Sequence, residues 1–209
     1  MFSVTLNGAK IEWMSLIDLQ WREFIEKGDK HSFSVIYNKR VDDLYSYGIS
    51  LGFNKELCKD AIQDTFYKLY ITREKLQHVD NITAYLFMTF KHRLIDLKKI
   101  ERRDENIDSI TDSFTIHVTV LEEIIDVEDS EMLKKKVTSL LNSLTVNQRE
   151  IVYLKFMVGL NHREIAEVLS INEESARKLL YRAMEKMRKY ASRENIPEKL
   201  LLYVLLSIM

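Results

Sequence analysis

Hydrophobic residues recur every three or four positions along most of this chain, the spacing that places them on one face of a helix. In the first half, capping residues and polar stretches divide this pattern into blocks. Gly28 is suited to end the first block, and Asn54 is suited to cap the third. The polar run from Thr72 to Asp80 separates the third block from the fourth. The pattern predicts helices at residues 11–27, at 31–51, after Asn54, and at 81–103.

The segment 144–189 has the spacing of a helix-turn-helix that follows a supporting helix. Thr145 and Gln148 stand three residues apart, as in a capping box, at the predicted start of the supporting helix. Gly159 is a plausible residue to end that helix, because glycine accepts a left-handed backbone. Asn172 is suited to cap the third helix, so a recognition helix is expected to follow it.

A short second helix is predicted between these two, from His162 to Leu169. Ser170 occupies a turn position that glycine often holds, which costs about 1 kcal/mol if the backbone there is left-handed. Ile171 is expected to fill the angle between the helices. The remaining inward positions of the motif are expected to be Ile165, Ala166, Leu169, Ala176, Leu179, Leu180 and Ala183.

The outward positions of this motif are polar, basic or aromatic and are suited to contact base edges and phosphates in a major groove. The alternative is an amphipathic helical hairpin whose charges are merely solvated. The candidate residues for binding duplex DNA are Arg163, Glu174, Ser175, Arg177, Lys178, Tyr181 and Arg182.

The predicted helix at 81–103 places aromatic residues among cations. Rings that stack on bases and cations that hold phosphates are typical of single-stranded nucleic acid binding. Two simpler explanations compete with this one, because aromatic residues at helical spacing are often core and a basic face is often only solvated. The candidate residues are Tyr85, Lys91, His92, Arg93, Lys98, Lys99, Arg102 and Arg103.

Composition and charge divide the chain further. Five glycines and one proline in 209 residues favour a mostly helical protein. Residues 104–131 hold ten acidic and no basic side chains, whereas the net charge is +3 over 1–103 and +7 over 132–193. Basic blocks favour nucleic acid through counterion release, and an acidic block is repelled by it. The run FTIHVTV (114–120) within the acidic block is expected to be an extended linker rather than a strand in a sheet.

Over residues 20–190 the chain resembles a bacterial RNA polymerase sigma factor of the extracytoplasmic-function group of the sigma-70 family. The segment LTVNQREIVYLKFMVGLNHREIAEVLSINEESARKLLYRAMEKMR is similar to the family's fourth domain. CKDAIQDTFYKLY and NITAYLFMTFKHRLIDLKKIERR are similar to its second domain. The chain departs from the family pattern at Ala176-Arg177, where Val and Lys are frequent, and at Lys91-His92, where Arg and Asn are usual.

The resemblance implies an all-α protein of two small helical domains joined by an acidic linker. The implied parts are a polymerase-docking and promoter-melting domain at 1–103, a linker at 104–131, a helix-turn-helix domain at 132–192 and an apolar tail at 193–209. It implies that core RNA polymerase, promoter DNA and an anti-sigma factor are partners, and that the protein is a cytoplasmic initiation factor and not an enzyme. The residues that match the family's polymerase-binding helix are Asp60, Gln63, Asp64 and Phe66.

Two other functions remain open at this point. A response regulator with a similar helix-turn-helix would need an α/β receiver domain, and residues 1–103 show no alternation of strands and helices. A sigma-like decoy that binds polymerase without initiating is compatible with the sequence. Genome-wide start-site mapping in a reconstituted reaction separates these functions.

No cofactor, metal site or stable membrane insertion is expected. His92 and Asp96 stand four residues apart, but the histidines and the single cysteine, Cys58, lack metal-ligand spacing. The start of the chain lacks the pattern of a signal peptide. The apolar run at 199–209 is about half of the roughly 20 residues that a bilayer span needs. It is compatible with a helix packed on the last domain, a partner-binding segment or a membrane contact, in that order of preference.

Overall fold

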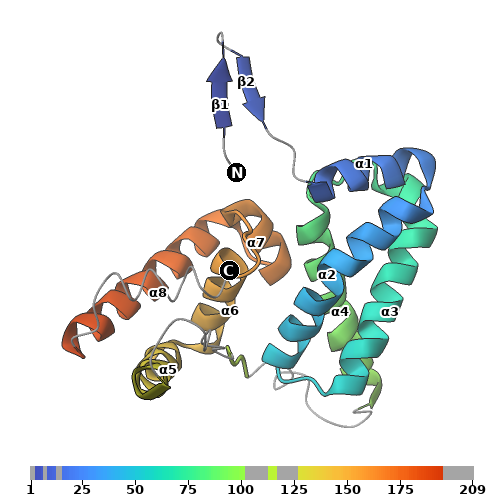
Figure 1. The fold of residues 1–209 in the computed structure, drawn as a ribbon. Coiled ribbons are helices and arrows are strands. Elements are labelled where there is room, and N and C mark those ends of the chain that lie inside the picture. The colour runs from blue at the N-terminus through green and yellow to red at the C-terminus, as the bar shows by residue number, and fades with distance from the viewer. Residues whose placement is uncertain (1–2, 7–8, 13–15, 102–112, 117–126, 195–209) are drawn as a thin grey trace.

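The computed structural model describes an N-terminal hairpin and two helical domains (Figure 1), covering residues 3–6, 9–12, 16–101, 113–116 and 127–194. Strand β1 (Ser3–Leu6) pairs antiparallel with β2 (Ala9–Glu12). The sequence pattern predicted no strand here, and the helix expected from residue 11 begins at Leu16. The all-α class is therefore confirmed for the two domains, and the hairpin is a correction to it.

The first domain is a bundle of four α-helices and one short 3-10 helix. Each α-helix packs on the next along the chain from α1 to α4, and α2 also contacts α4. The core includes the fully buried side chains of Phe24, Leu44, Tyr47, Phe87 and Phe90. The elements are α1 (Leu16–Lys27), α2 (Lys30–Ser50), α3 (Lys55–Thr72), η1 (Arg73–Leu76) and α4 (Ile82–Glu101).

Local sequence signals set the helix ends in this domain. Gly28 follows α1 with a φ of 65°, and the backbone N–H of Gly28 donates to Phe24 O over 2.9 Å. The Asn54 side chain accepts a 2.8 Å hydrogen bond from the N–H of Leu57 at the start of α3. Gly28 therefore ends α1 as predicted, because glycine accepts the left-handed backbone there. Asn54 begins α3 as predicted, because its side chain accepts a hydrogen bond from a free backbone N–H of the first turn.

Gly48 allows α2 to approach α3 and α4 closely. A Cβ atom at this position would lie 2.6 Å from Cys58 Sγ and 3.0 Å from a ring carbon of Phe90. We expect Gly48→Ala to lower the free energy of unfolding by about 1–3 kcal/mol, the usual cost of overpacking a core. Urea unfolding of the full chain measures this, with the exposed Ser34→Ala on the same helix as the control. A Gly48→Ala protein as stable as the control would contradict the close packing.

The second domain comprises α5 (Val127–Asn142), α6 (Val146–Phe156), α7 (His162–Leu169) and α8 (Glu173–Arg193). Helices α6 and α7 both pack on α8. The capping box of Thr145 and Gln148 is present at the start of α6, as predicted. Helix α6 ends at Phe156, and Gly159 takes a φ of 82° in the loop that follows. Asn161 and Glu164 form a second capping box at the start of α7, which the sequence analysis missed.

A described piece of the segment between the domains packs into the protein. Residues 113–116 have no regular secondary structure, yet Phe114 is buried. The Thr115 N–H donates to Ser50 O over 2.8 Å, and Arg149 Nε donates to Phe114 O over 2.6 Å. Helix α5 starts inside the segment that was expected to be linker. The rest of the acidic segment, Arg102, Arg103 and the tail from residue 195 lie outside the described residues.

Candidate nucleic-acid and protein interfaces

Helix α8 presents the predicted outward residues to solvent. The Asn172 side chain accepts a 2.7 Å hydrogen bond from the N–H of Ser175 and so begins the helix as predicted. Ala176, Leu180 and Ala183 are buried on the opposite face, as expected. The seven candidate residues for duplex DNA are all exposed: Arg163, Glu174, Ser175, Arg177, Lys178, Tyr181 and Arg182.

Two cations of this face are held by acidic residues one turn earlier on the helix. Arg177 pairs with Glu173, and Lys178 Nζ lies 2.6 Å from Glu174 Oε1. More than 60% of each cationic side chain is exposed (65% and 63%). Exposed pairs of this kind contribute only about 0.3–0.5 kcal/mol, so DNA phosphates can replace the carboxylates. Arg177 and Lys178 are thus positioned near the first turns of α8 and remain available.

Ser170 adopts the left-handed conformation that the sequence suggested, with φ 54° and ψ 42°. This backbone turns the chain between α7 and α8, and the Ile171 N–H donates to Ala166 O over 3.0 Å. Ile171, which was predicted to fill the angle between the helices, is 37% exposed and is therefore only partly covered. It lines a crevice that Lys91 and His92 of α4 also line.

We expect Ser170→Gly to stabilise the protein by up to about 1 kcal/mol, because glycine enters the left-handed region without the steric cost of a Cβ. A thermal unfolding midpoint higher by about 2–4 °C is the expected reading for a chain of this size. Ser34→Gly in the second turn of α2 is the matched control and should destabilise by about 0.5–1 kcal/mol. An unchanged or lower midpoint for Ser170→Gly would contradict the strain at the turn.

Helix α4 divides its aromatic residues between the core and the surface. Phe87 and Phe90 are fully buried, so these two aromatic residues belong to the core and do not face nucleic acid. Tyr85 is half-buried, and the side chains of His92 and Lys99 are exposed. Arg102 and Arg103, at the predicted end of this basic run, lie outside the described residues. The described basic face of α4 therefore consists of Lys91, His92, Arg93, Lys98 and Lys99.

Two of these cations form ion pairs with other helices. Arg93 Nε lies 2.6 Å from Asp64 Oδ2 on α3, and both side chains are partly exposed. This contact joins a candidate melting residue to a candidate polymerase-binding residue. Lys91 Nζ lies 2.7 Å from Glu150 Oε1 on α6, and only 12% of the lysine side chain is exposed. Lys91 is therefore covered in this arrangement of the domains.

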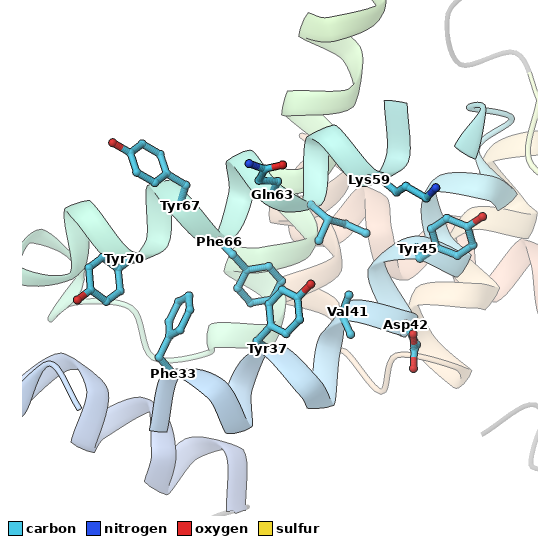
Figure 2. A pocket seen from close by; sticks show the side chains of 11 residues that line it. Phe33, Tyr37, Val41, Asp42, Tyr45, Lys59, Gln63, Phe66, Tyr67 and Tyr70 are labelled. Atoms are coloured by element: carbon cyan, nitrogen blue, oxygen red, sulfur yellow. The ribbon is translucent and has the colours of Figure 1, made fainter. Parts of the chain in front are cut away.

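Helices α2 and α3 border an apolar groove of about 680 Å³ (Figure 2). Gln63 and Phe66, two of the candidate polymerase-binding residues, line it. Phe66 is 3% exposed and forms part of the wall, with its ring centroid 4.8 Å from that of Tyr37. Asp60 is exposed on α3 and does not line the groove. The groove is lined by Phe33, Tyr37, Val41, Asp42, Tyr45, Lys59, Ile62, Gln63, Phe66, Tyr67 and Tyr70.

The exposed tyrosines of this groove were missed in the sequence analysis. Tyr67 is 64% exposed, Tyr70 is 43% exposed and Tyr37 is 37% exposed. Large exposed aromatic side chains that gather in one place are typical of protein-binding surfaces. A signal was present, because Phe33, Tyr37, Val41 and Tyr45 recur every four residues on one face of α2. The sequence analysis used that stripe only to predict a helix.

Known proteins similar to this chain all point to one family. The family model for sigma-70 region 4 matches residues 134–187, from within α5 to within α8. The ECF RNA polymerase sigma factor SigM of Bacillus subtilis (strain 168) is 25% identical over 153 residues, which cover 73% of this chain and 91% of SigM. SigW from the same strain, another ECF RNA polymerase sigma factor, is 21% identical over 171 residues, covering 79% of this chain and 91% of SigW. These matches support an extracytoplasmic-function sigma factor of the sigma-70 family.

Two solved structures share the fold of this sigma factor. CnrH in complex with the cytosolic domain of CnrY has a TM-score of 0.53 and 18% identity, covering 85% of this chain and 98% of that one. RpoE from Bartonella quintana, crystallised with the anti-sigma factor NepR, has a TM-score of 0.53 and 19% identity, covering 77% and 96%. The two-domain helical architecture predicted from the sequence is therefore confirmed.

The described part of the chain contains neither a metal-binding cluster nor a membrane-spanning helix. Among its residues, no group of three or more histidine, cysteine, aspartate or glutamate side chains is arranged to hold a metal ion. None of the described helices combines the length and apolar character needed to cross a bilayer. The crevice beside His92 is lined by residues of α4, α6, α7 and α8 and of the turn between α7 and α8.

Proposed function

We propose that this sigma factor binds core RNA polymerase and promoter DNA and directs the start of transcription, without catalysing a reaction itself. The observation that carries the proposal is the exposed basic face of α8, within the segment that matches sigma-70 region 4. Its buried face is fixed by Ala176, Leu180 and Ala183, so the exposed side chains project from a rigid helix. A rigid helix that projects cations and a tyrosine is suited to a major groove.

The first domain is assigned polymerase docking and binding of the separated DNA strand. The groove between α2 and α3 is the proposed docking site for polymerase, with Gln63 and Tyr67 exposed at its edge. An amphipathic helix laid into an apolar groove is a common mode of protein recognition, and it suits these side chains. Asp60 and Asp64 would add polar contacts on the same helix.

The basic face of α4 is assigned to the separated strand. Lys91, His92, Arg93, Lys98 and Lys99 would hold its phosphates, and Tyr85 offers a ring at the protein surface. Extruding bases from a duplex costs a few kcal/mol, which stacking and ionic contacts offset. The sequence assigns Arg102 and Arg103 to the same task.

Regulation and location follow from the same proposal. The related structures contain CnrY and the anti-sigma factor NepR, and we extend this mode of control to the present chain. We place the protein in the cytoplasm, where bacterial polymerase and promoters meet. The single buried thiol of Cys58 is compatible with that reducing compartment.

Transcription from a genomic library with purified core polymerase tests the function. We expect start sites that share a common upstream motif and that depend on the added sigma factor. Binding to core polymerase without any initiation would instead support the decoy function. Initiation that does not depend on core binding would contradict both.

A further inference from the structure

Glu150 of α6 is a buried carboxylate at the junction between the two domains, and its side chain is 6% exposed. Its Oε1 atom accepts a 2.5 Å hydrogen bond from the hydroxyl of Tyr47 on α2. The same oxygen accepts a 2.7 Å charge-assisted hydrogen bond from Lys91 Nζ on α4. One carboxylate of the second domain therefore binds two helices of the first.

Aromatic rings pack around the Tyr47 end of the triad of Tyr47, Lys91 and Glu150. The Tyr47 ring stacks on Tyr153 of α6 with centroids 5.7 Å apart. Phe114, from the segment between the domains, lies 6.1 Å from the Tyr47 ring and 5.5 Å from the Tyr153 ring. Burial, followed by the nearby Glu150 charge, holds the pKa of Tyr47 well above its ordinary value, so its hydroxyl stays a donor.

A second polar contact fixes the relative position of the domains. Asn81 Nδ2, before α4, donates a 2.7 Å hydrogen bond to Glu164 Oε1 on α7. Helices α4 and α7 lie side by side (Figure 1). Burial of apolar side chains favours contact between the domains. The directional hydrogen bonds and the ion pair favour one relative orientation of the domains.

The contact uses a residue that the proposed function needs elsewhere. Lys91 belongs to the basic face assigned to the separated DNA strand, yet α6 covers it and Glu150 neutralises it. A lysine with 12% of its side chain exposed cannot also hold a phosphate without leaving this site. A buried ion pair gains little net free energy over two hydrated ions, so separation of the domains is energetically accessible.

We propose that the triad of Tyr47, Lys91 and Glu150 is an intramolecular latch that keeps the free protein closed and its melting helix occupied. The DNA-binding role that the latch gives to Lys91 rests on the proposed function. The contacts of Tyr47, Lys91 and Glu150 do not depend on that function. Phosphates of the separated strand compete with Glu150 for Lys91. Strand separation in the promoter and separation of the two protein domains are thereby coupled through Lys91.

The distance between the domains tests the latch directly in the full chain. Spin labels at Ser34→Cys on α2 and Ser192→Cys on α8 report it, because both serines are exposed. The native Cys58 thiol is fully buried, and burial raises its pKa to about 11, so it stays unlabelled. We expect one narrow distance distribution for the protein that carries only the labels.

Glu150→Gln should shift this distribution to longer and broader distances, because it leaves the Lys91 ammonium buried without its counter-charge. Glu185→Gln is the matched control, since Glu185 pairs with Lys189 on α8 and its side chain is 44% exposed. The double variant Glu150→Gln with Lys91→Met should restore the narrow distribution, because no unpaired charge is then buried. Rescue of this kind separates a latch from simple loss of folding, and circular dichroism of each variant verifies the helical content.

Binding of fluorescent oligothymidylate provides the functional measurement. If the closed form holds about 90% of the molecules, Glu150→Gln should bind this strand about tenfold more tightly than the Glu185→Gln control. Distance distributions that coincide for Glu150→Gln and the control overturn the latch, even if the protein initiates transcription. Longer distances in a protein that never initiates with core polymerase overturn the proposed function and leave the latch standing.

Discussion

The double variant Arg177→Ala with Lys178→Ala should bind a promoter fragment at least about 30-fold more weakly than the unmodified sigma factor. Each lost contact to a base or phosphate typically costs about 1–3 kcal/mol, and both side chains are exposed at the start of α8. Their ion pairs with Glu173 and Glu174 are too weak to compensate. Binding is measured on a fragment taken from the transcription experiment, as a function of salt.

The salt dependence separates specific contacts from general charge. If Lys178 contacts a phosphate, the slope of log affinity against log salt should decrease by about 1. Lys189→Ala is the matched control, because Lys189 also pairs with a glutamate four residues earlier but lies three turns further along α8. Affinity for core polymerase should be unchanged in both variants. Equal losses of DNA and polymerase binding in the double variant would contradict the assigned roles.

Local signals in the sequence were sufficient for most of the helix ends. Asn54, Thr145 and Asn172 all cap helices, because each side chain accepts a hydrogen bond from a backbone N–H three residues later. The left-handed turn at Ser170 was also recognisable from the spacing of the motif. These features depend on neighbouring residues only, so a single sequence contains the required information.

Features that depend on distant contacts were missed. Lys91 and Glu150 are 59 residues apart, and no periodicity connects them. The stripe on α2 predicted a helix, but a hydrophobic stripe does not reveal how far a neighbouring helix covers it. Tyr37 remains 37% exposed for this reason. The partial exposure of Ile171 was also not predictable, because the direction of the turn after Ser170 determines which residues Ile171 contacts.

The candidate surfaces therefore differ in how accessible they are while the two domains are in contact. The exposed face of α8 is accessible while the domains are in contact, and so is the groove between α2 and α3. The basic face of α4 is partly occupied, since Lys91 is bound to Glu150 and Arg93 to Asp64. An order of events follows, in which docking and upstream contacts can form first and strand capture comes after the domains separate.

Docking itself should depend on the groove, and Gln63→Ala with Tyr67→Ala should weaken binding to core polymerase by about 30-fold or more. Tyrosines at the centre of interfaces often contribute 2 kcal/mol or more, which corresponds to a factor of about 30. Tyr67 is 64% exposed on α3, so its loss should leave the fold intact. Fluorescence anisotropy of a labelled sigma factor titrated with core polymerase measures the affinity.

Ile71→Ala provides the comparison on the same helix. Ile71 is 58% exposed, similar to Tyr67, but it does not line the groove. A general loss of exposed hydrophobic surface on α3 would weaken binding in both proteins alike. A docking site in the groove requires a large loss for Gln63→Ala with Tyr67→Ala and at most a small one for Ile71→Ala. Since the upstream contacts lie on α8, promoter-fragment binding by the isolated sigma factor should be the same in all of these proteins.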